Sequence, residues 1–295
     1  MRRLIFCFLL TAYCLQSPAQ VNIWEGVAHH KSVVMTPYLA DNSPLTTHPS
    51  PLIPQNNIAV IVCPGGSYFW HDTENEGREV GRWLQRNGIT AFVLNYRTAN
   101  VPAFITHYRL LVRGNRYPDP QDDLRQALRY VKAHAAEYHI DTCRVGAMGF
   151  SAGGHLVMSA AELFEKKDRP AFVAPIYPVV TMTAPYVHKR SRRGLLGDSR
   201  TRNKELRDLL SLEKHVPEDC PPVFLVNCQD DPTVDYRNSE LLDSALTVKG
   251  IPHRYFQFKT GGHGFGASSR KGSDESRQWM PLFLDWLNKL ITDNR

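Results

Sequence analysis

Short apolar runs that alternate with amphipathic helical stretches are the feature that most constrains the fold of this chain. Six runs have the length of a strand, are rich in Val, Ile and Phe, and are in several cases continuous: residues 58–62, 90–95, 144–150, 172–180, 223–227 and 254–258. Continuous apolar runs suit strands that are buried on both faces. Strands that alternate with helices pair in parallel, so we predict an α/β fold with a mostly parallel central sheet and helices on both faces.

Helix signals fill several of the gaps between these runs. Thr73 and Glu76 form a capping-box pattern, and Gly88 ends the helix that they are predicted to open. Two further helices, over residues 119–135 and 279–291, are predicted by apolar residues that recur every third or fourth position.

Two segments, residues 97–118 and 181–215, are longer than ordinary connections. Segments of this length inside a compact domain tend to be functional. We therefore expect residues 181–215 to be an insertion that covers the substrate pocket. Residues 188–193 within it form a basic cluster, which we interpret as part of a solvated loop.

The N-terminus has the pattern of an export signal. Arg2 and Arg3 precede a run of twelve apolar or small residues, 4–15, and Ser17-Pro18-Ala19 supplies the small residues that a signal peptidase reads. The run is shorter than the roughly 17 to 25 residues of a membrane span. We therefore expect residues 1–19 to be cleaved and residues 20–295 to form a single α/β domain. The mature protein is then periplasmic or secreted, without a membrane anchor.

Charge and cysteine content narrow the classes of partner. The whole chain has 35 basic and 29 acidic residues, and loss of Arg2 and Arg3 leaves 33 against 29, an excess of +4. So small an excess does not indicate a nucleic-acid partner. The four cysteines after residue 19 lie at the ends of predicted strands that are not neighbours, so we expect them to be mostly unpaired; they are Cys63, Cys143, Cys220 and Cys228.

A G-x-S-x-G pattern, Gly149-Phe150-Ser151-Ala152-Gly153, follows one apolar run and leads into a stretch compatible with a helix. A serine on a sharp strand-to-helix turn needs small neighbours, so the two glycines are steric requirements of such a turn. Serine is a poor nucleophile unless a base, oriented by an acid, takes its proton. Ser151 is the predicted nucleophile.

Candidates for the acid and the base follow later strands. Asp230 and Asp231 come after the run 223–227, and His263 lies in the glycine-rich loop 261–266 beyond the last predicted strand. Functional loops gather at the carboxyl edge of a parallel sheet. The order serine, aspartate, histidine is also the order found in α/β-hydrolases.

Backbone donors for a developing oxyanion are expected in the loop after the first strand of the parallel sheet. The amides of Gly66 and Ser67 occupy the donor positions there, and Ala152 beside the nucleophile gives a third. Which of the two loop amides points inward stays open.

Four side chains are candidates to line the substrate pocket: Tyr68, Trp70, His71 and His188. The aromatic run 68–70 follows the oxyanion loop directly, where it would stack on a sugar, close an acyl pocket or pack beneath the cover.

With these motifs in place, the chain resembles the exported α/β-hydrolase serine esterases of bacterial polysaccharide breakdown. These form the acetyl xylan esterase and feruloyl esterase-like group related to hormone-sensitive lipases. The resemblance rests on residues 64–68, 95–97, 149–156, 191–193 with 195–197, 221–225 and 261–266.

The resemblance implies a role for each motif. Ser151 is the nucleophile, His263 the base and Asp231 the acid, because the group's Asp-Pro-x-Val pattern fits Asp231 and not Asp230. The oxyanion donors carry over as Gly66, Ser67 and Ala152.

The activity implied is hydrolysis of short acyl esters, chiefly acetyl, on plant polysaccharide such as xylan, with no metal or organic cofactor. The partner is then an acylated carbohydrate or a small ester. The alternatives are a feruloyl or other small-ester hydrolase, an arylformamidase or peptidase-like hydrolase with the same triad, and an inactive carbohydrate-binding homologue. The oligomeric state stays open.

Overall fold

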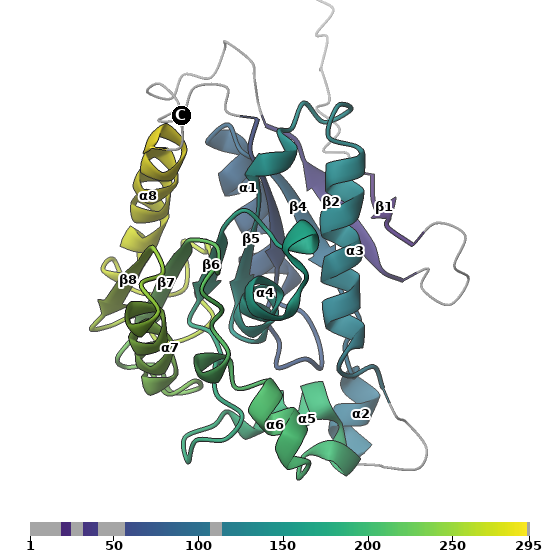
Figure 1. Ribbon diagram of the computed structural model, residues 1–295, viewed down its shortest axis with the longest axis vertical. Helices are drawn as coiled ribbons and strands as arrows, with labels where there is room; N and C mark the ends of the chain where they lie inside the picture. The colour runs from purple at the N-terminus through teal and green to yellow at the C-terminus, as the bar shows by residue number, and fades with distance from the viewer. Residues whose placement is uncertain (1–18, 25–31, 41–56, 107–113, 294–295) are drawn as a thin grey trace, which may run out of the picture.

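The computed structural model describes residues 19–24, 32–40, 57–106 and 114–293. Within these ranges eight strands form one sheet, in the order β1-β2-β4-β3-β5-β6-β7-β8 (Figure 1). Strands β3 to β8 are parallel to one another, and β2 joins β4 in the antiparallel direction, as β1 joins β2. The prediction of a mostly parallel sheet is confirmed.

The strands that the apolar runs predicted are β3 to β8. Most ends agree to within one residue, but β6 stops at Ile176, before the end of the predicted run 172–180. The full set is β1 (Val21–Asn22), β2 (Val34–Tyr38), β3 (Ala59–Cys63), β4 (Thr90–Asn95), β5 (Val145–Phe150), β6 (Val173–Ile176), β7 (Val223–Cys228) and β8 (His253–Phe258). The first two strands were not predicted. β1 has only two residues, and Pro37 in β2 argues against a central strand because proline has no backbone N–H.

Helices cover both faces of the sheet, as predicted. They are α1 (Glu79–Arg86), α2 (Val101–Thr106), α3 (Asp119–Ala133), α4 (Ala152–Leu163), α5 (Lys189–Leu196), α6 (Lys204–Leu209), α7 (Arg237–Val248) and α8 (Trp279–Asp293). Helices α3, α4 and α7 lie on one face and α1 and α8 on the other (Figure 1). Strand β3 shows the division: Ala59, Ile61 and Cys63 belong to the first core, and Val60 and Val62 to the second.

The turn before α1 differs from its prediction. Residues Thr73–Arg78 form a π-helical segment, η2, and its N-cap is Asp72, whose carboxylate accepts from the amide of Asn75 at 3.0 Å. The predicted capping box of Thr73 and Glu76 is therefore wrong. Glu76 instead turns inward and is only 3% exposed. A π-helical turn holds more residues than an α-helical one and is often found at functional sites.

The predicted solvated loop at 188–193 is also wrong, because α5 occupies it. Three of its residues, Ser191, Leu195 and Leu196, are fully buried. A Cβ on Gly194 would come within 2.3 Å of the carbonyl oxygen of Ser67, so α5 lies directly on the oxyanion loop. Arg193 donates to the carbonyl oxygen of Ala103 in α2 at 2.8 Å. Helices α2, α5 and α6 gather at one end of the molecule (Figure 1).

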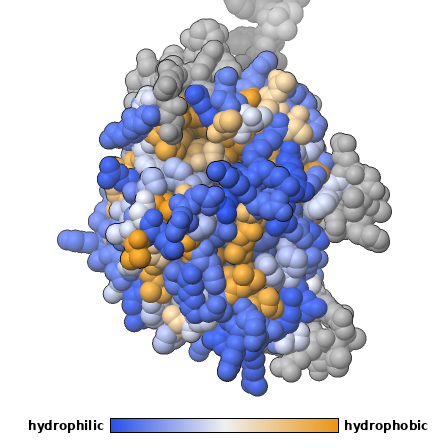
Figure 2. Space-filling model, viewed as in Figure 1, coloured by the Kyte–Doolittle hydropathy of each residue, from blue (hydrophilic) through white to orange (hydrophobic). Residues whose placement is uncertain are grey.

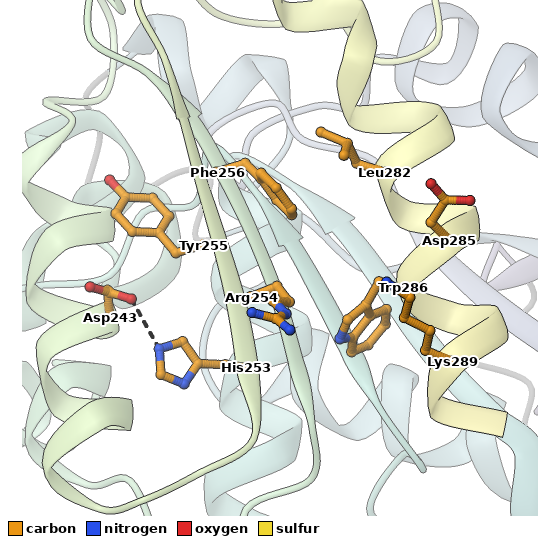
Figure 3. Close-up of a pocket in the computed structure, with 9 residues that line it drawn as sticks. All are labelled: Asp243, His253, Arg254, Tyr255, Phe256, Leu282, Asp285, Trp286 and Lys289. Atoms are coloured by element: carbon orange, nitrogen blue, oxygen red, sulfur yellow. Dashed lines mark hydrogen bonds and ion pairs between the residues drawn. The ribbon is translucent and has the colours of Figure 1, made fainter. Parts of the chain in front are cut away.

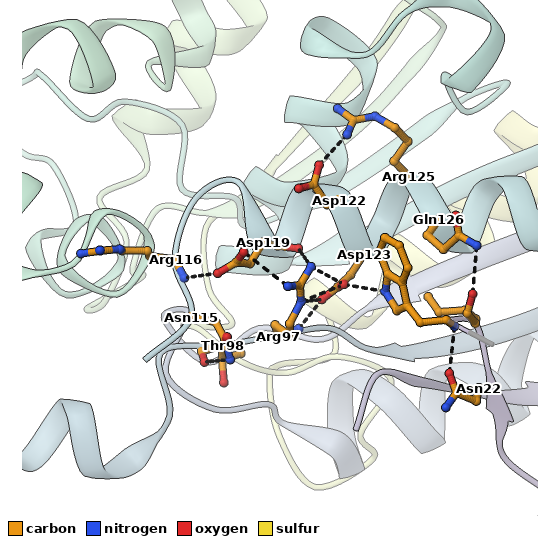
Figure 4. A network of polar contacts seen from close by, with 12 residues as sticks. Asn22, Arg97, Thr98, Asn115, Arg116, Asp119, Asp122, Asp123, Arg125 and Gln126 are labelled. Atoms are coloured by element: carbon orange, nitrogen blue, oxygen red, sulfur yellow. Dashed lines mark hydrogen bonds and ion pairs between the residues drawn. The ribbon is translucent and has the colours of Figure 1, made fainter. Parts of the chain in front are cut away.

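A polar network fastens the N-terminal edge of the sheet to α3 (Figure 4). Asp123 on α3 is fully buried, and it accepts from the guanidinium of Arg97 at 3.0 Å and from the indole of Trp24 at 2.9 Å. Burial raises the pKa of Asp123, and this effect outweighs the opposite one of Arg97. The carboxylate therefore depends on both donors.

The four cysteines of the described residues are free, as expected; Cys63, Cys220 and Cys228 are buried and Cys143 is exposed. The strand order explains this, since β6 separates the strands that follow Cys143 and Cys220, and β5 and β6 separate those that end at Cys63 and Cys228.

The face shown in Figure 2 is mainly hydrophilic, with small hydrophobic patches. Among the helices of the described residues, none has the length and apolar character to cross a membrane. Residues 1–18 of the predicted export signal lie outside the described part of the chain.

Candidate active site

Ser151 stands at the turn between β5 and α4 with φ +54° and ψ −115°, a backbone conformation that is strained for a residue with a side chain. Its neighbours have no room for a Cβ. A Cβ added to Gly149 would lie 2.1 Å from the carbonyl oxygen of Gly153. A Cβ added to Gly153 would lie 2.0 Å from the carbonyl oxygen of Cys63. The steric reason for the two glycines is therefore present in the structure, and the turn presents Ser151 at the carboxyl edge of the sheet.

A chain of hydrogen bonds joins Ser151, His263 and Asp231. His263 Nε2 lies 2.9 Å from Ser151 Oγ, and His263 Nδ1 lies 2.7 Å from Asp231 Oδ2. The Asp231 side chain is 1% exposed, and its second oxygen accepts from the amides of Thr233 and Val234 at 2.8 and 2.9 Å. An ionised carboxylate only accepts, so Nδ1 donates to it and Nε2 is free to take the serine proton.

The neighbouring Asp230 has a different position. Its two oxygens accept from the amides of Gly261 and Gly262 at 3.1 and 2.8 Å, so it holds the start of the histidine loop (residues 261–266). The two adjacent carboxylates therefore have different roles. Asp231 contacts the imidazole of His263, and Asp230 holds the loop that carries this histidine.

The oxyanion loop, residues 64–68, bends sharply after β3. Gly66, Ser67 and Tyr68 all have positive φ, at 134°, 57° and 63°. Within the described part of the chain, the amides of Gly66, Ser67 and Ala152 have no hydrogen-bond acceptor. The amide of Gly65 is taken, because it donates to Glu76 Oε2 at 2.7 Å. The three amides named from the sequence are thus unpaired beside Ser151.

The prediction that Tyr68 lines the pocket is wrong. Its side chain is 1% exposed, and its hydroxyl lies 2.8 Å from His155 Nδ1 in the core. His155 Nε2 in turn contacts the carbonyl oxygen of Leu210 at 3.0 Å, and burial lowers the pKa of this histidine to about 4. Positive φ at Tyr68 turns its side chain under the loop, which a strand-to-loop motif does not predict.

The other two aromatics of the run lie nearer the surface. Phe69 is 2% exposed beneath the guanidinium of Arg193, whereas Trp70 is partly exposed and packs edge-on against Phe104 of α2, with 5.2 Å between ring centroids. Of the alternatives for this run, packing beneath the cover applies to Phe69. Trp70 keeps an accessible surface.

Of the two histidines predicted to line the pocket, His71 packs against the support of the oxyanion loop and His188 lies closer to the triad. His71 packs edge-on against Tyr96, whose hydroxyl donates to the carbonyl oxygen of Pro64 at 2.6 Å, so its contacts are with residues that support the oxyanion loop. His188 lies beside the triad. Its pKa is lowered to about 4, mainly by burial and further by the facing His263 and Arg190, while Asp231 acts in the opposite direction. His188 is therefore uncharged near neutral pH.

Two residues that the sequence did not point to as site residues lie against the triad. Tyr177, after β6, has its ring 4.7 Å from that of His263, and its hydroxyl donates to Glu76 Oε1 at 2.9 Å. Nothing in the sequence marked Tyr177. Glu76 was visible only as part of a capping pattern, and the π-helical turn gives it another place.

A pocket with a volume of about 550 Å³ lies elsewhere, at the outer edge strand β8 between α7 and α8 (Figure 3). It is lined by Asp243, His253, Arg254, Tyr255, Phe256, Leu282, Asp285, Trp286 and Lys289. None of these is a triad or oxyanion residue. Among the described residues, no group of three or more His, Cys, Asp or Glu side chains is placed to hold a metal ion.

Comparison with known proteins agrees with this geometry. The model of the BD-FAE family matches residues 52–246. A curated relative, endo-1,4-beta-xylanase B of Butyrivibrio fibrisolvens, is 35% identical over 70% of this chain and 32% of its own length. The acetylxylan esterase of Xylanibacter ruminicola is 32% identical over 70% of this chain and 41% of its own length. The chain thus spans less than half the length of these two relatives.

Among solved structures, the acetyl ester-xyloside bifunctional hydrolase of Caldicellulosiruptor lactoaceticus superposes with a TM-score of 0.75 at 29% identity. The match covers 93% of this chain and 98% of that one. Since the family match takes in more than half of the chain and the fold agrees over nearly all of it, this chain belongs to the BD-FAE family and has the α/β-hydrolase fold.

Proposed function

We propose that this protein is a serine esterase that removes short acyl groups, above all acetyl, from plant polysaccharide such as xylan. The observation that carries the proposal is the hydrogen-bond chain from Asp231 through His263 to Ser151, set on a strained strand-to-helix turn. Three unpaired amides beside the serine add the donors that acyl transfer needs.

The reaction follows from these positions. Ser151 Oγ attacks the ester carbonyl carbon while His263 takes its proton, and Asp231 holds the imidazole in the tautomer that can accept it. The negative charge on the carbonyl oxygen is stabilised by amides among those of Gly66, Ser67 and Ala152. His263 then gives the proton to the departing sugar hydroxyl, and water releases the acyl group from Ser151 by the same steps.

The substrate class is supported by the relatives. Two of the similar proteins carry acetylxylan esterase or acetyl ester-xyloside hydrolase in their names, and a third is a xylanase. We assign Trp70 and His188 to the sugar-binding side of the site, because the first is an accessible aromatic ring and the second an uncharged imidazole beside the triad. The cover segment (residues 181–215) would lie over the acyl-carrying sugar.

We also propose that residues 1–19 are an export signal and that the mature enzyme works in the periplasm or outside the cell, where polymeric xylan is met. N-terminal sequencing of protein recovered from the native cell envelope or medium tests this. A chain that begins near Gln20 agrees with the proposal, and one that keeps Met1 contradicts it.

Product analysis tests the activity. The purified protein is incubated with acetylated xylan, acetylated pectin and feruloylated arabinoxylan, and acetate and hydroxycinnamate are quantified, with Ser151→Ala as the matched control. We expect acetate release from xylan that the Ser151→Ala variant lacks. Hydroxycinnamate as the main product would instead favour the feruloyl alternative, and no release from any substrate would count against the esterase itself.

A further inference from the structure

The oxyanion loop (residues 64–68) and the histidine loop (residues 261–266) are far apart in the sequence, and the side chain of Glu76 contacts the first loop directly and the second through Tyr177. Glu76 Oε2 accepts from the amide of Gly65 in the oxyanion loop at 2.7 Å. Glu76 Oε1 accepts from the hydroxyl of Tyr177 at 2.9 Å. A Cβ on Gly65 would meet both Glu76 Oε2 and Ser151 Cβ within 2.9 Å, so the carboxylate sits directly behind the nucleophile.

Tyr177 completes the connection on the other side. Its hydroxyl, which donates to Glu76, also accepts from the amide of Gly266 in the histidine loop at 2.9 Å. Its ring packs against His263 and Phe265, with centroids 4.7 and 4.6 Å apart. A continuous path of three hydrogen bonds thus runs from one loop to the other through two buried side chains.

The backbone of η2 touches the histidine loop as well. The carbonyl oxygen of Asn75 accepts from the amide of Ala267 at 3.0 Å, and a Cβ on Gly266 would lie 2.1 Å from that oxygen. The π-helical turn therefore brings Glu76 and its neighbours to the place where the two loops meet, which an ordinary first helical turn with an outward-facing glutamate would not do.

The electrostatic setting of Glu76 fits a role in the site more than a role in stability. Burial raises its pKa to about 7, while the facing His263 acts in the opposite direction. The other charged or titratable groups that face it are Asp72 on its own turn, Tyr177 after β6 and Tyr96 after β4. A buried carboxyl group is costly, and a neutral side chain of the same shape would fill the space at lower cost.

We infer that Glu76 is a positioning residue of the proposed esterase, which holds the oxyanion loop and the histidine loop in register through Gly65 on one side and Tyr177 on the other. The inference rests on the proposed function, since it assigns a role in the same site. Glu76 does not touch the reacting atoms. It fixes the distance between the donors that face the oxyanion and the imidazole that carries the proton.

The test uses two variants and a matched control. Glu76→Gln keeps the shape but removes the charge and mismatches the tyrosine hydroxyl. Tyr177→Phe removes that hydroxyl, and with it the hydrogen bonds to Glu76 and to Gly266. Glu74→Gln is the control, because Glu74 lies on the same turn but has a side chain that is 41% exposed and pairs with Arg78. Melting temperature is measured for each, and kcat and KM on 4-nitrophenyl acetate are normalised to the active sites titrated with a 4-nitrophenyl phosphonate.

We expect kcat to fall by about 10- to 100-fold in Glu76→Gln and about tenfold in Tyr177→Phe, with KM within about threefold of wild type. Burial raises the pKa of Glu76 to about 7, so its charge changes within the pH range of the assay. The kcat/KM profile should therefore change shape near pH 7 in Glu76→Gln and keep the wild-type shape in Glu74→Gln.

Wild-type turnover is measured first, because its absence overturns the esterase proposal itself. If wild type turns over and both variants keep kcat within twofold of Glu74→Gln, the positioning role is wrong. A loss of rate that is explained entirely by fewer active sites titrated by the phosphonate, with an unchanged pH profile in Glu76→Gln, also overturns it. If Glu76→Gln does not fold, Tyr177→Phe decides, and an unchanged kcat in that variant overturns the inference.

Discussion

The loops around Ser151 and the cover segment touch each other, but they are held in different ways. In the loops, short carboxylates bind backbone amides close by: Asp231 accepts from Thr233 and Val234, and Asp230 from Gly261 and Gly262. In the cover, long arginine side chains reach the carbonyl oxygens of other segments. Short side chains lose little conformational freedom when they bind, whereas each arginine loses much more.

Two arginines connect the cover to other segments, since Arg193 donates to carbonyl oxygens of α2 and Arg200 to that of Tyr117. Within the cover, Arg192 and Arg207 both donate to the carbonyl oxygen of Met182. Arg192 and Arg193, which belong to the predicted solvated loop, thus make internal hydrogen bonds instead. From this contrast we expect substitutions in the loops to act mainly on turnover, and substitutions in the cover to act mainly on substrate binding.

The largest effect is expected within the loops. Ser151→Ala and His263→Ala should lower turnover by roughly three or more orders of magnitude while the fold is kept, because each removes a reacting group. Steady-state kinetics on 4-nitrophenyl acetate, with melting temperatures alongside, measures this.

The two adjacent aspartates give a sharper form of the same test. Asp231→Asn should cost about 100-fold or more in kcat, because the imidazole loses its acceptor. Asp230→Asn should cost about tenfold, because one of two loop contacts is weakened. A silent Asp231→Asn beside a damaging Asp230→Asn would reverse the assignment of the two carboxylates.

Replacing Arg193, which connects the cover to α2, should change KM more than kcat. Arg193→Ala removes contacts to α2, to Asp198 and to the ring of Phe69, so we expect KM on acetylated xylo-oligosaccharide to rise about tenfold with kcat within threefold. Arg193→Lys should not rescue it, since a lysine ammonium cannot span the same acceptors. Arg190→Ala, an exposed neighbour, is the control, and an equal effect there would contradict a specific role for Arg193.

The cover also predicts the acyl preference. Rates on a 4-nitrophenyl ester series should fall steeply from acetate to octanoate, because a cover fastened by charged groups penalises burial of a long apolar tail. Repeating the series with Arg193→Ala sharpens the comparison, as a loosened cover should flatten the decline. A wild-type profile that rises with chain length would contradict the carbohydrate-esterase proposal.

The smallest effect concerns the point where the cover rests on α4. Both carboxyl oxygens of Glu162 are buried without a hydrogen-bond partner among the described residues, and burial, reinforced by Glu213 of the cover, raises the pKa of Glu162 well above its usual value. An acid whose pKa is higher in the folded state stabilises the fold fully only below its unfolded pKa of about 4.5, and this contribution is lost as pH rises toward the folded value.

Glu162→Gln should therefore raise the melting temperature by a few degrees at pH 8 and by much less at pH 5, corresponding to about 1–2 kcal/mol. Calorimetry at the two pH values measures the difference. Glu165→Gln, an exposed neighbour whose pKa is lowered by Lys167, should show no such gain. Equal melting temperatures of Glu162→Gln and wild type at pH 8 would mean that the carboxyl group is not strained there.

The sequence was sufficient for the parts of the molecule that local sterics determine. The parallel strands follow from continuous apolar runs, and the turn at Ser151 follows from two glycines whose Cβ atoms would collide with backbone. The contact between His263 and Asp231 could be expected because strand ends of a parallel sheet share one edge.

The errors arose where a residue acts across a long sequence distance. Glu76 has the spacing of a helix cap, but its partners lie 11 and 101 residues away in sequence, and local spacing carries no information about them. In the sequence Arg193 is one of several basic residues in a cluster, but in the structure it donates to carbonyl oxygens about 90 residues earlier. Tyr68 reads as a pocket aromatic, and its backbone conformation decides otherwise.

Backbone strain around Ser151 has a consequence for how the proposed esterase can be engineered. Seven non-glycine residues of the described ranges have positive φ, and four of them border the site: Ser67, Tyr68, Ser151 and Tyr177. Each such conformation costs on the order of 1–3 kcal/mol, and glycine would relieve it. At Tyr68 and Tyr177 the loss of a buried ring, about 3–5 kcal/mol, would exceed that gain. A screen that selects only for heat resistance is therefore drawn to the two serines, and a Ser151→Gly variant would be a more stable protein without its nucleophile.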